Sequence, residues 1–158
     1  MKNFLKILLL VCFFPFSLLF FLFRKKRKGK VPARQSNTYQ DAENEHFDLM
    51  PKIDELYSSV MRSKDYTGSK AKRLEELCKK DISLAPDVWK SMKHNSPQLR
   101  SRPTYPSYRQ LATLYTSRGE YDEAIGICRK AIRDGYNDDG TQMKMSGRIE
   151  RIKEKAAK

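Results

Sequence analysis

The side chains best suited to metal binding or nucleophilic chemistry in this 158-residue chain belong to two histidines and three cysteines. His46 and His94 each lack a second histidine or a cysteine at the spacing of a metal site. Cys12, Cys78 and Cys128 form no C-x-x-C pair, so their spacing indicates neither a zinc site nor a redox centre. We interpret the cysteines as small buried apolar residues, and we expect no metal and no cofactor.

Several carboxylates in the sequence are direct neighbours. Such pairs include Glu75 with Glu76, Asp122 with Glu123, and Asp138 with Asp139. On a helix, neighbouring side chains point about 100° apart, which is typical of a solvated face rather than an acid–base pair. The chain also has no H-E-x-x-H, no G-x-S-x-G and no glycine-rich phosphate loop. We predict no catalytic residues; the alternative is a small hydrolase or transferase that depends on the loop within 87–104.

The elements that could position a binding site are clearest in residues 105–138, where the pattern predicts two helices joined by a tight turn. In the first helix, apolar and aromatic residues recur at three- and four-residue steps: Tyr108, Leu111, Ala112 and Tyr115. Gly119 then breaks the period as a left-handed cap would. The second helix carries a similar stripe, made of Tyr121, Ala124, Cys128, Ala131 and Ile132. Acidic residues near its start and basic residues near its end fit the helix dipole.

This spacing resembles the tetratricopeptide repeat, W-x2-L-G-x2-Y followed by a small alanine and then a phenylalanine. In this chain, the motif positions are occupied in order by Tyr108, Leu111, Ala112, Tyr115, Ala124 and Cys128. The terminal proline of the motif is replaced by Tyr136. The alternative is an ordinary helical hairpin with the same amphipathic pattern.

The resemblance implies a binding surface. Proteins of this family hold an extended peptide or a partner helix in a concave groove lined by the first helix of each pair. The groove candidates in the clear repeat are Arg109, Thr113, Thr116 and Ser117. Arg109 is suited to bind a carboxylate through two hydrogen bonds. The set lacks the family's lysine and asparagine clamp, so we expect no specificity for a C-terminal peptide, and the alternative is that these residues are simply solvated.

Residues 48–86 resemble a degenerate copy of the same hairpin. Asp48 is a good N-cap for a helix that reaches about residue 62, and a second helix is expected from about residue 70 to residue 84. The apolar positions repeat those of the clear unit, with a five-residue insertion before Cys78. Asp81 departs from the pattern, because it falls where the clear repeat has Ala131.

The remaining parts of the domain are a connection and a final helix. Residues 87–104 are expected to form a short helix that starts at Pro86, with Trp89 buried in the core, and then a loop. Residues 141–157 predict a helix that caps the array, or alternatively a basic amphipathic helix on a membrane or a partner. Because stable stacks usually need three or more repeats, self-association into a homo-oligomer is a further hypothesis.

The N-terminal part of the chain predicts a membrane anchor. Residues 4–23 are almost entirely apolar, long enough at about 20 residues to cross a hydrocarbon core, and they lack the small-residue cleavage site of a signal peptide. A basic flank follows, made of Arg24, Lys25, Lys26, Arg27, Lys28 and Lys30. We assign residues 1–30 to the anchor and this flank. Because the heavier positive flank stays inside, we expect the helical domain in the cytoplasm. Residues 31–47 have no period and predict a flexible tether.

The charge distribution argues against nucleic acid as the partner. The chain has a net charge of +13, and residues 1–34 hold nine basic side chains and no acids, which leaves +4 for residues 35–158. Most of the excess therefore lies beside the membrane, where each lysine or arginine gains about 1 kcal/mol from anionic lipid.

The sequence thus predicts an all-α chain, with a single transmembrane helix, a tether, and a tetratricopeptide-like domain over residues 48–158. The predicted function is a membrane-anchored adaptor or scaffold that holds another protein in its groove and contacts membrane lipid through residues 4–30. One alternative is an anionic-lipid or nucleic-acid binding protein that uses the basic segment. The other is an exported or lipid-anchored helical-repeat protein.

Overall fold

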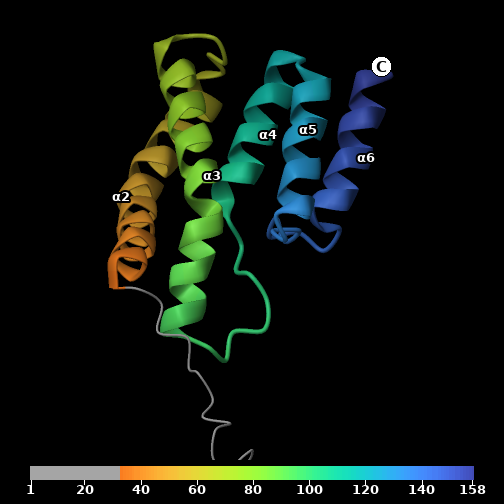
Figure 1. Ribbon diagram of the computed structural model, residues 1–158. Helices are drawn as coiled ribbons and strands as arrows, with labels where there is room; N and C mark the ends of the chain where they lie inside the picture. The colour runs from red at the N-terminus through yellow and green to blue at the C-terminus, as the bar shows by residue number, and fades with distance from the viewer. Residues whose placement is uncertain (1–32) are drawn as a thin grey trace, which may run out of the picture. The chain divides into compact units, whose positions relative to one another are not determined.

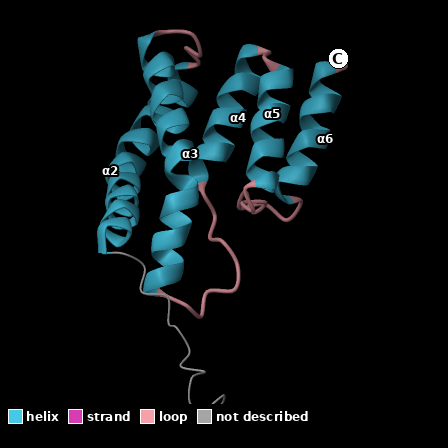
Figure 2. Ribbon diagram, viewed as in Figure 1, coloured by secondary structure: helices cyan, strands magenta, loops and turns pink. Residues whose placement is uncertain are grey.

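The computed structural model describes the backbone of residues 33–158 and the side chains of residues 38–158. The predicted membrane anchor over residues 1–30 and its basic flank lie outside the described residues. All secondary structure within residues 33–158 is helical, with no strand, which confirms the all-α prediction (Figures 1 and 2). Residues 34–158 form one compact unit. None of the described helices combines the length and the apolar character needed to cross a membrane.

The described elements are five helices in chain order: α2 (Ala33–Ser63), α3 (Ser69–Asn95), α4 (Pro106–Arg118), α5 (Tyr121–Arg133) and α6 (Lys144–Ala156). Helices α2 and α3 form a long antiparallel pair, and α4, α5 and α6 follow it as successive neighbours, each packed on the one before (Figure 1). Helix α4, which carries the candidate groove residues, therefore packs between α3 and α5.

Helix α2 begins earlier than the sequence suggests. The prediction of a flexible tether over residues 31–47 is wrong from residue 33 onward, because this segment is the first half of α2. Its partner is the second half of α3: Ser91 donates a hydrogen bond to Glu43, and the ammonium group of Lys90 lies 4.8 Å from the ring centre of Tyr39. Ala42 is also buried. These contacts are mostly polar, so they leave no apolar period in the sequence.

Helix α3 continues past Pro86, where the sequence predicts its end. Residues 87–95 therefore extend α3 and do not form a separate short helix, and His94 lies near the end of α3. A proline inside a helix costs about 3 kcal/mol. Ala85 and Val88 are fully buried near Pro86, and the Tyr136 hydroxyl donates a hydrogen bond to the Ala85 carbonyl at 2.8 Å. We infer that these tertiary contacts offset that cost.

The α4–α5 hairpin has the predicted form. Pro106 stands in the first turn of α4, where a missing backbone N–H removes no helical bond. Gly119 ends α4 with a φ of 82°, in the left-handed region that glycine favours. The N–H of Glu120 then donates to the carbonyl of Tyr115 at 2.9 Å, and α5 starts at Tyr121. The last predicted helix, over residues 141–157, is observed as Lys144–Ala156.

A single apolar core runs through all five helices. It includes the predicted stripe residues Tyr108, Leu111 and Ala112 of α4 and Ala124 and Cys128 of α5, all fully buried. Trp89, which the sequence places in the core, is only half-buried. The guanidinium of Arg102 covers part of its ring, at 5.3 Å from the ring centre.

Candidate functional site

A groove open to solvent lies between α4 and α6, with a cavity volume of about 260 Å³. Its lining consists of Thr113, Thr116 and Ser117 from α4 and Arg148, Arg151, Ile152 and Lys155 from α6. Three of the four residues that the resemblance implied as groove candidates therefore share one surface. The second wall of the groove comes from α6, for which the sequence favours a capping role.

The fourth candidate, Arg109, does not line this groove. Its Nη1 lies 3.4 Å from the backbone carbonyl oxygen of Asp139, to which it donates a hydrogen bond. Arg109 thus holds the loop between α5 and α6. The predicted role of Arg109 as an anchor for a ligand carboxylate has no support in this geometry.

The hydroxyl groups on the α4 wall face the groove mainly as acceptors. Thr113 Oγ1 donates to the carbonyl of Arg109 at 2.8 Å, and Thr116 Oγ1 donates to that of Ala112 at 2.7 Å. Each threonine therefore has its proton engaged on its own helix. For Ser117, no hydrogen bond to its hydroxyl occurs within the described residues, so this hydroxyl remains available as a donor.

One of the three cations on the α6 wall is already neutralised. Arg148 Nε donates to the fully buried carboxylate of Asp139 at 2.9 Å, and its Nη1 lies 3.3 Å from Thr113 Oγ1. Burial acts to raise the pKa of Asp139, but hydrogen bonds from Thr141 and Arg148 outweigh it and hold the pKa below its usual value. Arg148 therefore fixes α6 to α4 and to the preceding loop.

The other two cations are more exposed and less engaged by protein groups. Arg151 is 48% exposed, and its nearest carboxylate is that of Asp139 at 4.0 Å. Lys155 is exposed and forms no ion pair within the part of the chain that the structure describes. Arg151 and Lys155 thus give this groove its positive charge.

A second polar cluster is buried where α2, α3 and α4 meet. Asp81 of α3 is fully buried, and its Oδ1 lies 2.7 Å from Nδ1 of His46 on α2. Ser107 of α4 donates to Asp81 Oδ2 at 2.6 Å, and the hydroxyl of Tyr105 donates to the Asp81 carbonyl at 2.9 Å. The His46 and Tyr105 rings are stacked with their centres 4.4 Å apart.

This cluster contains serine, histidine and aspartate, but their order excludes a catalytic triad. In a triad the histidine stands between the serine and the acid, so that it can accept the serine proton. Here Asp81 stands between Ser107 and His46, and all three side chains are almost completely inaccessible to solvent. The cluster therefore joins three helices and has no route to a substrate. The sequence missed it, although Asp81 as a departure from the repeat pattern was a signal.

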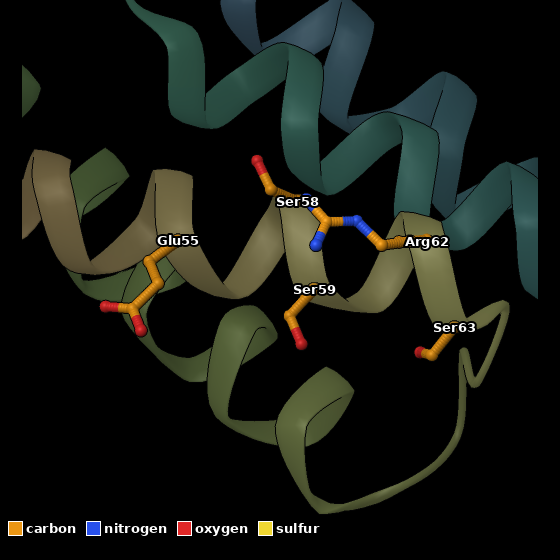
Figure 3. A pocket seen from close by; sticks show the side chains of 5 residues that line it. All are labelled: Glu55, Ser58, Ser59, Arg62 and Ser63. Atoms are coloured by element: carbon orange, nitrogen blue, oxygen red, sulfur yellow. The ribbon is translucent and has the colours of Figure 1, made fainter.

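A further hollow follows one face of α2, with a cavity volume of about 460 Å³ and a lining of Glu55, Ser58, Ser59, Arg62 and Ser63. Figure 3 shows that Arg62 extends along the helix toward Ser58. All lining side chains come from a single helix and include one acid and one base. This surface therefore has no net charge and no second wall to define a ligand.

The cysteines are not poised for chemistry. Cys78 and Cys128 are free and fully buried. Burial is the main cause that raises the pKa of Cys128 to about 11, and it also raises the pKa of Cys78. Both thiols therefore stay protonated at neutral pH, in agreement with the apolar role expected for them. Cys12 lies outside the described residues. No group of three or more potential metal ligands occurs among the described residues.

The α4–α6 groove is thus the surface with the clearest binding character among residues 38–158. Compared with protein-family models, curated proteins and solved structures, the chain has no match.

Proposed function

We propose that this chain is a membrane-anchored protein-interaction module that holds a segment of another protein in the groove between α4 and α6. The observation that supports this most directly is the groove itself. It is open, bounded by two helices and lined by hydroxyl, cationic and apolar side chains, with no carboxylate, histidine or cysteine among them to act as a general base.

The proposal treats α4 and α5 as a tetratricopeptide-like repeat and α2 and α3 as a degenerate copy of it. The order of antiparallel helices and the left-handed turn at Gly119 support this interpretation (Figure 1). In such an array α4 would be the first helix of its pair, the one that contributes to a binding surface. Helix α6 would then occupy the place of the first helix in a following repeat.

The proposal also places residues 4–23 in a membrane and the helical domain on its cytoplasmic side. The length and apolar character of that segment support it, and so does the positive flank that follows. In this arrangement the flank contacts anionic lipid, while the groove on the compact unit formed by residues 34–158 remains available to a protein.

Site-specific photo-crosslinking in native membranes tests the proposed function. A photoreactive residue replaces Ser117 in the full chain, and a control places it at Ser83, which is exposed on α3. We expect a discrete protein adduct from position 117 that is absent from position 83. Identical adducts from both positions, or lipid adducts alone, would refute the interaction module.

A further inference from the structure

We propose that the segment held in the α4–α6 groove is acidic and that Arg151 and Lys155 of α6 bind its carboxylates; this inference rests on the proposed function. It makes α6 one of two binding walls, whereas the sequence favours a capping role for this helix, with a basic amphipathic helix on a membrane or a partner as the alternative. The ligand is identified by its chemistry, a stretch of protein chain rich in aspartate and glutamate.

The first argument is charge complementarity. The seven lining residues include three cations and no carboxylate. Asp139 compensates Arg148, whose side chain is only 17% exposed. Arg151 and Lys155 remain, and the nearby acid Glu150 is engaged by Lys153 at 2.9 Å. Arg151 has only a long ion pair, at 4.0 Å from an Asp139 oxygen that Arg148 already contacts at 2.9 Å, and Lys155 has no ion pair within the described residues. A ligand with negative charge would complement both cations.

The second argument is spacing. Arg151 and Lys155 are four residues apart on one helix, so they stand about 6 Å apart along the groove. Alternate side chains of an extended peptide repeat at about 7 Å, and residues four apart on a partner helix repeat at about 6 Å. Either form of acidic segment can therefore offer one carboxylate to each cation. Charge-assisted hydrogen bonds of this kind are about twice as strong as neutral ones.

The rest of the groove fits the same ligand. Ile152, between the two cations, is largely buried and forms an apolar part of the lining. On the opposite wall the Ser117 hydroxyl can donate to a ligand carbonyl or carboxylate, whereas Thr116 can only accept. The two walls thus provide cationic, apolar and polar contacts to one segment.

The helix dipole provides a different reason for basic residues on α6, because cations near a helix C-terminus are stabilising. Lys153 and Lys155 stand in the last turn, where this effect operates. Arg151 precedes that turn, so the dipole does not account for it.

A binding measurement tests the acidic preference. The full chain is reconstituted in lipid nanodiscs of phosphatidylcholine alone, and the probe is a fluorescein-labelled peptide of alternating glutamate and alanine, followed by fluorescence anisotropy. In the groove variant, Arg151→Glu and Lys155→Glu are combined. The matched control combines Lys72→Glu on α3 with Arg129→Glu on α5, both exposed and without an ion pair in the described part of the chain.

Both variants change the net charge equally and leave the basic flank intact, so only the position of the change differs. We expect the groove variant to bind the acidic peptide at least about tenfold more weakly, while the control stays within about twofold of the parent chain. We also expect weak binding of a matched peptide with glutamine in place of glutamate. Equal losses in the two variants would refute a specific acidic site, because they would reflect net charge alone.

Crosslinking from position 117 separates this inference from the proposed function. An acidic captured segment that is lost in the groove variant supports both. Capture of a neutral or basic segment refutes the acidic inference and leaves the interaction module standing. Peptide binding without any protein adduct in native membranes supports the acidic site and refutes the module. An adduct between two copies of this chain, or displacement of the peptide by an oligonucleotide, would also overturn the inference, because the natural occupant would then be a second copy or a nucleic acid.

Discussion

Asp81 is the residue on which the contacts between α2, α3 and α4 converge. Its carboxylate is fully buried and is in contact with His46, Ser107 and Tyr105, each from a segment distant in sequence. A buried carboxylate is tolerated only when such partners satisfy it. The three partners are buried as well, and each has a hydrogen bond with Asp81. Removing Asp81 would leave their polar groups buried without this partner.

Replacing Asp81 therefore destabilises the protein far more than replacing a surface acid of the same helix. We expect Asp81→Ala to lower the free energy of unfolding by about 3 kcal/mol, since each polar group left buried without a partner costs about 1–3 kcal/mol. Asp87→Ala is the control, because Asp87 pairs with Lys90 at a largely exposed site and such pairs contribute at most about 1 kcal/mol. Urea unfolding of the full chain in detergent, followed by fluorescence of the single tryptophan, Trp89, measures both. Similar losses in the two variants would contradict the central role of Asp81.

Glu75 is the second residue whose charge is fixed by tertiary contacts. Partial burial acts to raise its pKa, but hydrogen bonds from Lys79, Arg118 and Tyr115 outweigh that effect and lower it from 4.5 to about 2. Arg118 also donates to the carbonyl of Tyr66 at 2.6 Å. Glu75 thus links the end of α4 to α3.

This lowered pKa predicts a loss of stability in acid. Because the folded pKa is below the unfolded one, the contribution of Glu75 is fully present above pH 4.5 and is lost as the pH falls toward about 2. After solvent screening we expect it to be on the order of 1 kcal/mol. Glu75→Gln should flatten the pH dependence of unfolding in this range, although Asp134 and Asp139, whose pKa values are also lowered, leave part of it.

The control for Glu75 is Glu76→Gln. Glu76 is 65% exposed, and its one ion pair within residues 38–158 is with Arg73 on the same helix. Unfolding curves at several pH values between 2 and 6 should be unchanged by this variant. A Glu75→Gln protein with the same acid sensitivity as the parent chain would show that Glu75 is not a source of that sensitivity.

At the scale of elements, the hairpin of α4 and α5 depends on backbone conformation at its turn. Gly119 has a φ of 82°, and a Cβ added there would meet no atom within 4 Å. Gly126, in the interior of α5, is equally open to an added Cβ but has helical backbone. The two glycines therefore differ in conformation and not in available space.

Alanine at these two positions should have opposite effects. We expect Gly119→Ala to destabilise the protein by about 1 kcal/mol, since the left-handed conformation is strained for a residue with a Cβ. Gly126→Ala should stabilise it by about 0.5–1 kcal/mol, because alanine favours the helix over glycine. Urea unfolding measures both. Changes of the same sign in the two variants would contradict the assigned turn geometry.

At the scale of the whole molecule, the core closes within one chain. The long α2–α3 pair and α6 bury apolar residues that a single hairpin would leave exposed, among them Ile53, Leu74 and Met145. The large apolar side chains that remain exposed in the described part are Phe47, Ile132 and Met143, on separate segments. They form no extended patch of the kind that marks an interface between subunits.

Residues 34–158 should therefore fold without the preceding segment and without a second copy. We expect this fragment to be helical by circular dichroism, to unfold in one cooperative transition, and to sediment as a single chain. Self-association, which the small number of repeats suggested, predicts a mass of two or more chains instead. A fragment that is unfolded alone, or that folds only as an oligomer, would contradict a core closed within one chain.

The sequence by itself determined the helical class and the α4–α5 hairpin. Apolar residues at three- and four-residue steps specify a buried helical face, and Gly119 specifies a helix end in the left-handed conformation. Both signals are local in the sequence. It also identified three of the residues that line the groove, because the resemblance carried a position for each.

Only the tertiary structure decided where α2 begins, why α3 passes Pro86, and which cations line the groove. Each depends on contacts between residues far apart in sequence, such as His46 with Asp81 at a separation of 35 positions. Polar contacts of this kind have no period, so no window of sequence reveals them. The same holds for the groove, because Arg151 and Lys155 acquire their place only when α6 packs against α5 beside α4.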